Sequence, residues 1–216
     1  VSLAHNGVLF LDEFPEFKKN VLEVLRQPLE NGSVIISRAA ISLHYPGNFM
    51  LIGAMNPCPC GYLTDESHAC TCTANQVQRY TSRISGPLLD RIDLQIEVPA
   101  VKYKELKQGQ SSTDSRTMRE RIQKARKIQQ ERYSGLHFDT NNELSGSWLE
   151  KYCSLSENEH EFLESAVQRL GLSARAYTRI LRIARTIADL DGKEDISVNQ
   201  LAEAINYRFL DRRNSQ

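Results

Sequence analysis

Two adjacent carboxylates directly follow a short apolar run near the start of the sequence. Residues 7–11 are uninterruptedly apolar, and Asp12 and Glu13 come next. Such a run predicts a β-strand buried on both faces, as in a parallel sheet. At the end of a rigid strand the first carboxylate can hold Mg²⁺ through water while the second polarises an attacking water, as phosphoryl transfer requires. A strand that simply exits into a charged turn has the same pattern, so the pair alone leaves both interpretations open.

A polar residue at the end of a second apolar run favours the chemical interpretation. Residues 49–55 predict another buried strand, which Asn56 and Pro57 terminate. If the two strands are neighbours, Asn56 reaches the same edge as Asp12 and Glu13, where open α/β sheets bind their ligands. Asn before Pro also commonly caps a turn. The three side chains together favour nucleotide chemistry.

Four of the five cysteines crowd into fifteen residues: Cys58, Cys60, Cys70 and Cys72. Four thiolates give Zn²⁺ a closed tetrahedral shell, which is the structural arrangement. Cys-x-Cys pairs are a weaker signal than Cys-x-x-Cys, and free thiols or an adventitious disulfide are the alternative. The crowding favours zinc in a reducing compartment over a disulfide framework. We expect His68 to lie on the loop surface rather than replace a cysteine, and Cys153 to be buried filler.

The elements that position these side chains divide into two parts. In the first part the pattern predicts helices at 16–29 (stopped by Asn31-Gly32), at 76–84 and from Pro87, a hairpin of strands 34–37 and 41–45, and a strand at 94–98. Beyond it we predict only helices: 116–133, 146–153, 157–170, 174–190 and 197–210. The fold class is α/β: half of a parallel-sheet domain (1–100), a linker (101–115) and an all-helical domain (116–216).

Composition and hydropathy argue against a protein with one dominant charge and against a membrane-spanning or secreted protein. Lys plus Arg and Asp plus Glu both number 27, so no bulk electrostatic field favours nucleic acid or membrane, and any nucleic-acid surface is a local patch. No apolar run reaches membrane-spanning length and no secretory pattern opens the sequence, so we expect a cytoplasmic protein. Because the sequence begins without Met and enters a strand almost at once, we expect it to be a fragment of a longer protein.

Three segments make a family recognisable: residues 7–13 (GVLFLDE), 53–61 (GAMNPCPCG) and 85–93 (SGPLLDRID). The sequence resembles the magnesium-chelatase-like AAA+ ATPases, and most closely their bacterial competence-associated (ComM-like) branch. The resemblance runs over nearly the whole chain and ends at residues 203–208, which are similar to the family's last lid helix. It implies the C-terminal half of a P-loop AAA+ core followed by a helical lid.

The resemblance implies roles for individual residues. It makes Asp12 the Mg²⁺-associated acid, Glu13 the catalytic glutamate and Asn56 the first sensor. Arg91 resembles an arginine finger, which reaches the nucleotide of a neighbouring subunit and neutralises charge on the γ-phosphoryl group. Arg175 resembles the second sensor, an arginine that clamps the nucleotide from the lid.

Arg91 also has a purely structural alternative, a local salt bridge with Asp90 or Asp93. The flanking motif favours the finger. The other arginines at helical spacing in 116–133 and 174–190 are expected to be solvated helix faces.

The family's phosphate-binding loop is not in this sequence. No Gly-x-x-x-x-Gly-Lys-Ser/Thr occurs, and the only Gly-Lys pair, Gly192-Lys193, precedes Glu194. We therefore expect the phosphate cradle upstream of Val1 and expect this chain to be inactive as an ATPase on its own.

The resemblance implies an ATP- and Mg²⁺-dependent ring motor, with a hexamer as the expected ring. It further implies that the motor acts on DNA as a helicase in branch migration during recombination or natural transformation. The hairpin residue Arg38 is the DNA candidate, since hairpins before the first sensor point into the ring pore in related helicases. A chelatase-type subunit that drives metal insertion into a porphyrin is one alternative. A zinc-stabilised nucleic-acid-binding module without motor activity is the other.

Overall fold

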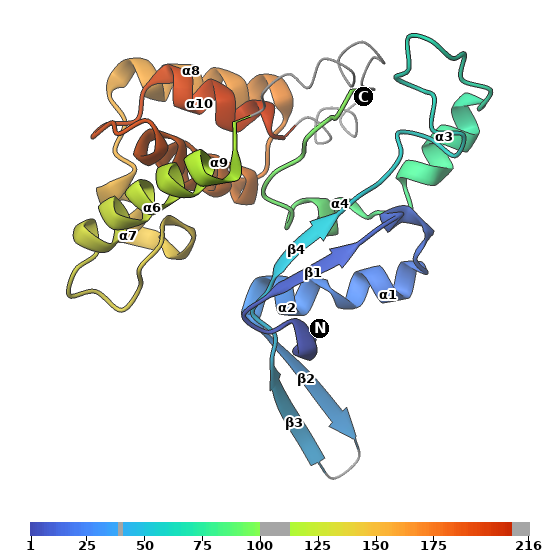
Figure 1. Ribbon diagram of the computed structural model, residues 1–216, viewed down its shortest axis with the longest axis horizontal. Coiled ribbons are helices and arrows are strands. Elements are labelled where there is room, and N and C mark those ends of the chain that lie inside the picture. The colour runs from blue at the N-terminus through green and yellow to red at the C-terminus, as the bar shows by residue number, and fades with distance from the viewer. Residues whose placement is uncertain (39–40, 100–112, 209–216) are drawn as a thin grey trace. The chain divides into compact units, whose positions relative to one another are not determined.

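The computed structural model describes residues 1–38, 41–99 and 113–208 of the 216-residue chain (Figure 1). The chain forms two compact units. The first comprises Val1–Ile92 with Glu97–Ala100, and the second comprises Asp93–Ile96 with Val101–Gln216. Residues 100–112, which include most of the predicted linker, lie outside the described residues. Within the described residues, no helix combines the length and apolarity needed to cross a membrane.

Two parallel strands form the centre of the first unit. β1 (Val8–Leu11) pairs with β4 (Met50–Gly53), with Val8 opposite Met50 and Leu11 opposite Gly53. The predicted neighbours are therefore confirmed as neighbours, and their carboxyl ends meet at one edge. This small parallel sheet with its helices agrees with the α/β expectation.

The prediction that these strands are buried on both faces was wrong for this chain. Val8 and Phe10 of β1 are 56% and 58% exposed, and Met50 of β4 is 63% exposed. Alternate residues of a strand point to opposite faces, so these side chains share one face of the pair. A strand that is apolar on both faces needs a layer on each side. The described residues provide no layer over this face.

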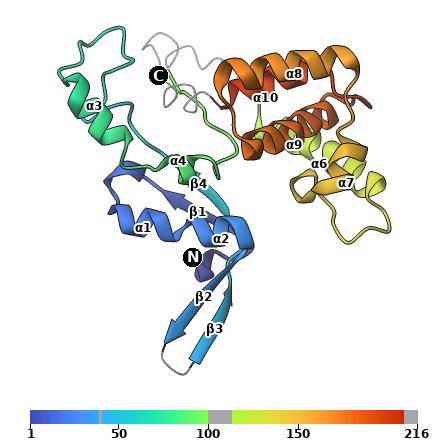
Figure 2. The same ribbon diagram turned by 180° about the vertical axis from the view of Figure 1, so that it is seen from behind.

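Short helices and a hairpin complete the first unit: η1 (Ser2–Ala4), η2 (Phe14–Glu16), α1 (Lys19–Val24), α2 (Arg26–Asn31), β2 (Ser33–Arg38), β3 (Ile41–Pro46), α3 (Ala74–Thr81) and α4 (Gly86–Leu89). The helix predicted at 16–29 is two helices, because Pro28 has no N–H to donate across the junction at Leu25. Gly32, with φ 62°, ends α2 as predicted. β2 and β3 form the predicted antiparallel hairpin, which extends away from the β1–β4 pair (Figures 1 and 2).

The prediction of a strand at 94–98 was wrong. These residues form neither a helix nor a strand, and the Gln95 amide donates to the Tyr207 carbonyl at 2.8 Å within the second unit. A strand requires a partner strand, and none of the described strands pairs with this segment.

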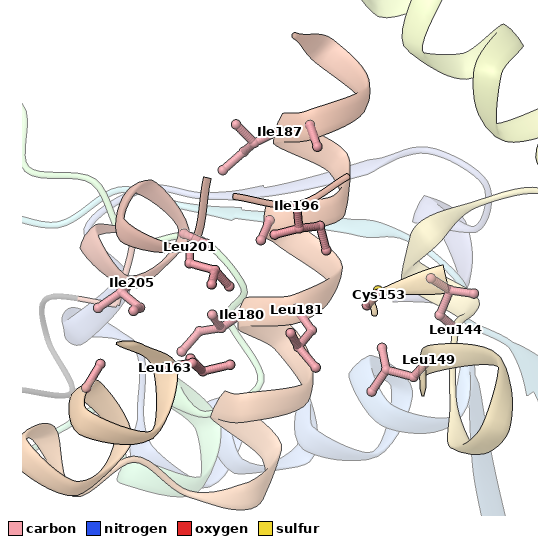
Figure 3. Close-up of a cluster of buried hydrophobic side chains, with 14 of the residues drawn as sticks. Leu144, Leu149, Cys153, Leu163, Ile180, Leu181, Ile187, Ile196, Leu201 and Ile205 are labelled. Atoms are coloured by element: carbon pink, nitrogen blue, oxygen red, sulfur yellow. The ribbon is translucent and has the colours of Figure 1, made fainter. Parts of the chain in front are cut away.

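The second unit is helical, as predicted: α6 (Ser115–Arg132), η3 (Asn141–Glu143), α7 (Gly146–Tyr152), α8 (Glu157–Leu170), α9 (Ala174–Leu190) and α10 (Val198–Asn206). The apolar face of α9 is the centre of its core. Ile180 and Leu181 of α9 are buried together with Leu163 of α8 and Leu201 of α10 (Figure 3).

A buried ionic network joins α6 to α9. The Asp189 carboxylate is fully buried and accepts hydrogen bonds from both terminal guanidinium nitrogens of Arg132, at 2.5 and 3.0 Å. Arg185 lies 3.1 Å from the same carboxylate, and the Asn141 amide donates to it at 2.8 Å. Because a buried charge is costly unless it is paired and hydrogen-bonded, this network holds three elements in one arrangement.

Candidate active site and metal centre

The acidic turn after β1 is held to the end of β4 by backbone hydrogen bonds. The Ala54 amide donates to the Leu11 carbonyl, and the Phe14 amide donates to the Ala54 carbonyl, both at 2.9 Å. Glu13 lies between them in the left-handed region, with φ 48° and ψ 44°. A residue with a side chain keeps this conformation, at a cost of about 1–3 kcal/mol, only where its surroundings enforce it. Asp12 and Glu13 are both exposed, so both carboxylates are accessible at the sheet edge.

Asn56 lies at the same edge, three residues beyond β4, and its side chain is exposed. Its backbone amide acts on the hydroxyl of Tyr80, a buried residue of α3. Burial raises the pKa of this tyrosine, the Asn56 amide lowers it, and the negative charges of Glu16 and Glu13 raise it further, so that the net shift is upward. Tyr80 therefore lies near the backbone of the candidate sensor.

Arg83 makes a second connection from α3 to this edge. Its guanidinium donates to the Glu16 carboxylate at 2.5 Å and to the Pro15 carbonyl at 3.2 Å, both in the 3₁₀ turn that follows Glu13. Sequence reasoning missed Tyr80 and Arg83. The available signal was the apolar face of the helix after the cysteines, on which Val77, Tyr80 and Ile84 recur at helical spacing.

Arg91 is buried in the first unit and bound within its own chain. Its guanidinium pairs with the Glu30 carboxylate of α2 and donates to the Pro87 carbonyl at 2.7 Å. The sequence alternatives were Asp90 and Asp93, whereas the structure provides Glu30, 61 residues away. Asp93 pairs with Arg179 in the second unit.

The two remaining predicted arginines lie elsewhere in the chain. Arg175 is an exposed residue in the first turn of α9, where the Ser173 hydroxyl caps the helix by accepting from the Ala176 amide at 3.2 Å. Arg38 ends β2 opposite Ile41. The side chain of Arg38 lies outside the described residues.

The four clustered cysteines converge on one point. Cys58 Sγ lies 3.4 Å from Cys60 Sγ and 3.7 Å from Cys70 Sγ, and Cys60 and Cys70 are 3.5 Å apart. All four sulfur atoms, including that of Cys72, lie within 4.8 Å of one another. Sulfurs bound tetrahedrally to Zn²⁺ at about 2.3 Å are about 3.8 Å apart. The set therefore has the spacing and chemistry of a four-thiolate metal site.

Electrostatics at this cluster also fit a cation. Backbone amides of Tyr62 and Thr71 lower the pKa of Cys60 to about 5. Desolvation and the neighbouring sulfur atoms raise the pKa of Cys72 to about 12 and raise the pKa of Cys70. Four thiols this close cannot all ionise alone, because each thiolate opposes the next. A bound divalent cation removes that penalty, since the thiolate is the form that binds metal.

His68 and Cys153, the two remaining candidates, are not part of the cysteine cluster. His68 faces Asp65 and Ser67, with its Nδ1 3.3 Å from the Asp65 carboxylate and 3.0 Å from the Ser67 hydroxyl. It is not among the four converging ligands, as expected. Cys153 is 3% exposed in the core of the second unit, and burial raises its pKa to about 11. This confirms it as buried filler.

Comparison with known proteins decides the family. The family "Magnesium chelatase, subunit ChlI" matches residues 1–106, and "Magnesium chelatase, subunit ChlI C-terminal" matches residues 112–208. The chain belongs to the magnesium chelatase ChlI family. Members of this family are AAA+ ATPases, so an ATPase with ATP and Mg²⁺ as cofactors is the family-level activity.

Relatives within the ChlI family include a competence protein. The chain is 47% identical to "Competence protein ComM" of Haemophilus influenzae over 98% of its length and 41% of that protein. It is 41% identical to the protein YifB of Escherichia coli, over 98% of the chain and 41% of that protein. A "Magnesium-chelatase subunit ChlI homolog" of Methanocaldococcus jannaschii is 23% identical over 94% of the chain and 48% of that protein. The chain thus spans about two fifths of the length of the ComM and YifB relatives.

Proposed function

We propose that this chain is part of an ATP-driven ring motor that acts on DNA, as a helicase in branch migration during recombination or natural transformation. One observation carries the proposal. The parallel pairing of β1 and β4 brings Asp12, Glu13 and Asn56 to one edge, in a chain 47% identical to a protein named for competence. The competence relative favours action on DNA over metal insertion, because the chelatase homologue matched over most of the chain is only 23% identical.

In this proposal each residue at the edge has one task. Asp12 holds the Mg²⁺ of the nucleotide, and Mg²⁺ neutralises charge on the phosphates. Glu13 orients and polarises the attacking water, and its left-handed backbone, fixed by the hydrogen bonds around it, directs the carboxylate. Asn56 contacts the water and the γ-phosphate. Arg175 serves as the second sensor.

Arg91 serves the neighbouring subunit as the finger. Its in-chain partner Glu30 is 43% exposed on its side chain, so the pair lies at the edge of the unit rather than in a sealed core. A phosphate of the neighbouring nucleotide would compete with Glu30 for the same guanidinium, since both are bidentate oxygen acceptors.

The experiment that tests the catalytic assignment is the change Glu13→Gln in the full-length protein. The amide keeps the size of the carboxylate but cannot polarise water, so ATP binding stays near normal while steady hydrolysis falls by at least about 100-fold. The matched control is Glu161→Gln on the exposed face of α8. Near-normal turnover of the Glu13→Gln protein would overturn the assignment.

The 216-residue chain alone should show no steady hydrolysis. Its sequence contains no P-loop motif, so no backbone cradle holds the β- and γ-phosphates. Phosphate release is measured with the purified chain and Mg²⁺-ATP. A clear turnover that Glu13→Gln abolishes would contradict this expectation.

The cysteine cluster is proposed to hold one structural Zn²⁺. The four sulfur atoms complete a closed shell and leave no position for water, so the metal orders the loop rather than takes part in hydrolysis. Cys58 follows Asn56 by two residues. An ordered metal loop therefore restrains the backbone that carries the sensor.

A further inference from the structure

Positive charge in the second unit is concentrated on one helix. α6 contains seven Lys or Arg residues and two Glu residues. The other described residues from 113 to 208 contain eight Lys or Arg and thirteen Asp or Glu. The region is neutral as a whole, yet one helix is strongly basic and the remainder is acidic. This segregation creates a local field that the balanced composition of the chain conceals.

Four of the α6 cations have no ion-pair partner in the part of the chain that the structure describes: Arg119, Arg121, Lys124 and Arg126. All four are exposed. The cations of α9 differ, because Arg179 pairs with Asp93, Arg182 donates to the Leu144 carbonyl and Arg185 pairs with Asp189. These three α9 arginines are therefore occupied by the fold, whereas the four α6 cations are available.

The four cations lie on two flanks of α6. At 3.6 residues per turn, Arg119 and Arg126 share one flank, and Arg121 and Lys124 lie about 140–220° around the helix from them. The buried residues Ala125 and Gln129 lie between the flanks on the inner side. The outer side carries two ion pairs within the helix, Arg116–Glu120 and Lys127–Glu131. It also carries Gln123 and Gln130.

This arrangement suits a partner with negative charge on both sides of the helix. α6 has 18 residues and is therefore about 27 Å long, with a diameter of about 10–12 Å. The major groove of duplex DNA is about 12 Å wide and is bordered by two phosphate backbones. A helix with cationic flanks and a polar outer side between them matches that charge distribution.

We propose that α6 is a DNA-binding element whose flanking cations, Arg119, Arg121, Lys124 and Arg126, contact the phosphodiester backbone. This inference deepens the proposed function and rests on its assignment of DNA as the partner. It places a contact surface in the helical unit, in addition to the hairpin residue Arg38. Since phosphates carry no base identity, α6 binds DNA without sequence preference.

The test is the salt dependence of DNA binding. Fluorescence anisotropy of a labelled 20-base-pair duplex is measured with the 216-residue chain and with the full-length protein, over a series of salt concentrations. The variant Arg119→Gln with Lys124→Gln removes one cation from each flank and keeps good helix formers. Each phosphate contact contributes about 0.9 to the slope of log K against log salt, so the slope should fall by about two and affinity by at least about tenfold.

The matched control is Arg169→Gln with Lys193→Gln, which removes two exposed cations of the same unit outside α6. It should leave the slope and the affinity within about twofold of wild type. Circular dichroism verifies that both variants keep their helices. Equal effects of the two double variants would overturn the assignment to α6.

Two further outcomes separate this inference from the proposed function. If DNA stimulates ATP hydrolysis by the full-length protein and the α6 variant responds normally, the inference fails and the motor proposal stands. If the full-length protein neither binds DNA nor responds to it, the DNA assignment of the motor fails as well. If the α6 variant changes only the oligomer size measured by light scattering, α6 is a subunit contact and the inference is overturned.

Discussion

At the scale of single residues, the position of a side chain was predictable where one loop or the ends of two adjacent strands hold it. Asp12 and Glu13 follow one strand and Asn56 follows the next, and the parallel pairing of these strands was enough to bring them to one edge. The cysteine cluster was predictable for the same reason, since one loop holds all four sulfur atoms. The partner of Arg91 was not predictable from the sequence, because Glu30 lies 61 residues away and only tertiary packing brings the two side chains together.

Tyr80 provides the prediction at this scale. Its hydroxyl lies near the backbone amide of Asn56, so Tyr80→Phe removes a polar group beside the sensor and should loosen it. In the full-length protein we expect kcat for ATP to fall about three- to tenfold with little change in KM, and a loss of stability of about 1 kcal/mol. Tyr62→Phe, in the exposed cysteine loop, is the control.

A double variant checks that Tyr80 acts through the sensor. When Asn56→Ala is already present, adding Tyr80→Phe should lower kcat little further, because coupled residues are not additive. Fully additive losses in kcat would show that Tyr80 acts independently of Asn56.

At the scale of elements, the helices of the second unit were predicted to within a few residues, because each has its own periodic apolar pattern. The strand at 94–98 was not, because a strand depends on a partner that its own sequence does not reveal. The same dependence explains why the burial of β1 and β4 was predicted wrongly. Their apolar sequences indicate strands that are covered on both faces, but Phe10 and Met50 are exposed in this chain.

The buried carboxylate of Asp189 gives a prediction for the helical unit. Asp189→Ala leaves Arg132 and Arg185 without their shared anion, so the unit should lose roughly 3–5 kcal/mol. Trp148 in α7 is the only tryptophan, so its fluorescence during urea unfolding reports on this unit alone. Asp195→Ala, at an exposed position, should cost less than about 0.5 kcal/mol. A loss below about 1 kcal/mol for Asp189→Ala would contradict the role of the network.

The cysteine loop gives a second prediction at this scale. Chain purified under reducing conditions should contain one zinc, which Cys58→Ser with Cys60→Ser removes and Cys153→Ser leaves in place. Metal analysis provides the measurement. Wild-type chain without zinc, with all five thiols freely titratable, would refute the metal assignment.

Acid should release this zinc. Protons compete with the metal for the sulfur atoms, so zinc is retained at neutral pH and lost as the pH falls. Backbone amides hold the pKa of Cys60 at about 5, so among the four thiolates this one resists protonation longest. A chelating dye follows the released metal as the pH is lowered. Zinc content that does not change with pH would contradict the four-thiolate assignment.

At the scale of the whole molecule, the proposed hydrolysis draws on more than this chain. The sequence contains no P-loop motif, and the chain spans 41% of the length of the ComM relative. The water-activating Glu13 and the finger Arg91 are proposed to serve different nucleotides, one in each of two neighbouring subunits. This division makes the two residues separable by experiment.

The most direct measurement of that claim is ATP hydrolysis by mixed full-length subunits. Arg91→Ala protein and Glu13→Gln protein should each bind ATP and each be nearly inactive alone. In mixed rings some interfaces pair an intact Arg91 with an intact Glu13, so mixing should restore part of the wild-type rate. Glu161→Gln subunits mixed with wild type provide the control for assembly and should retain full activity. No recovery in rings shown to contain both variants would contradict the account.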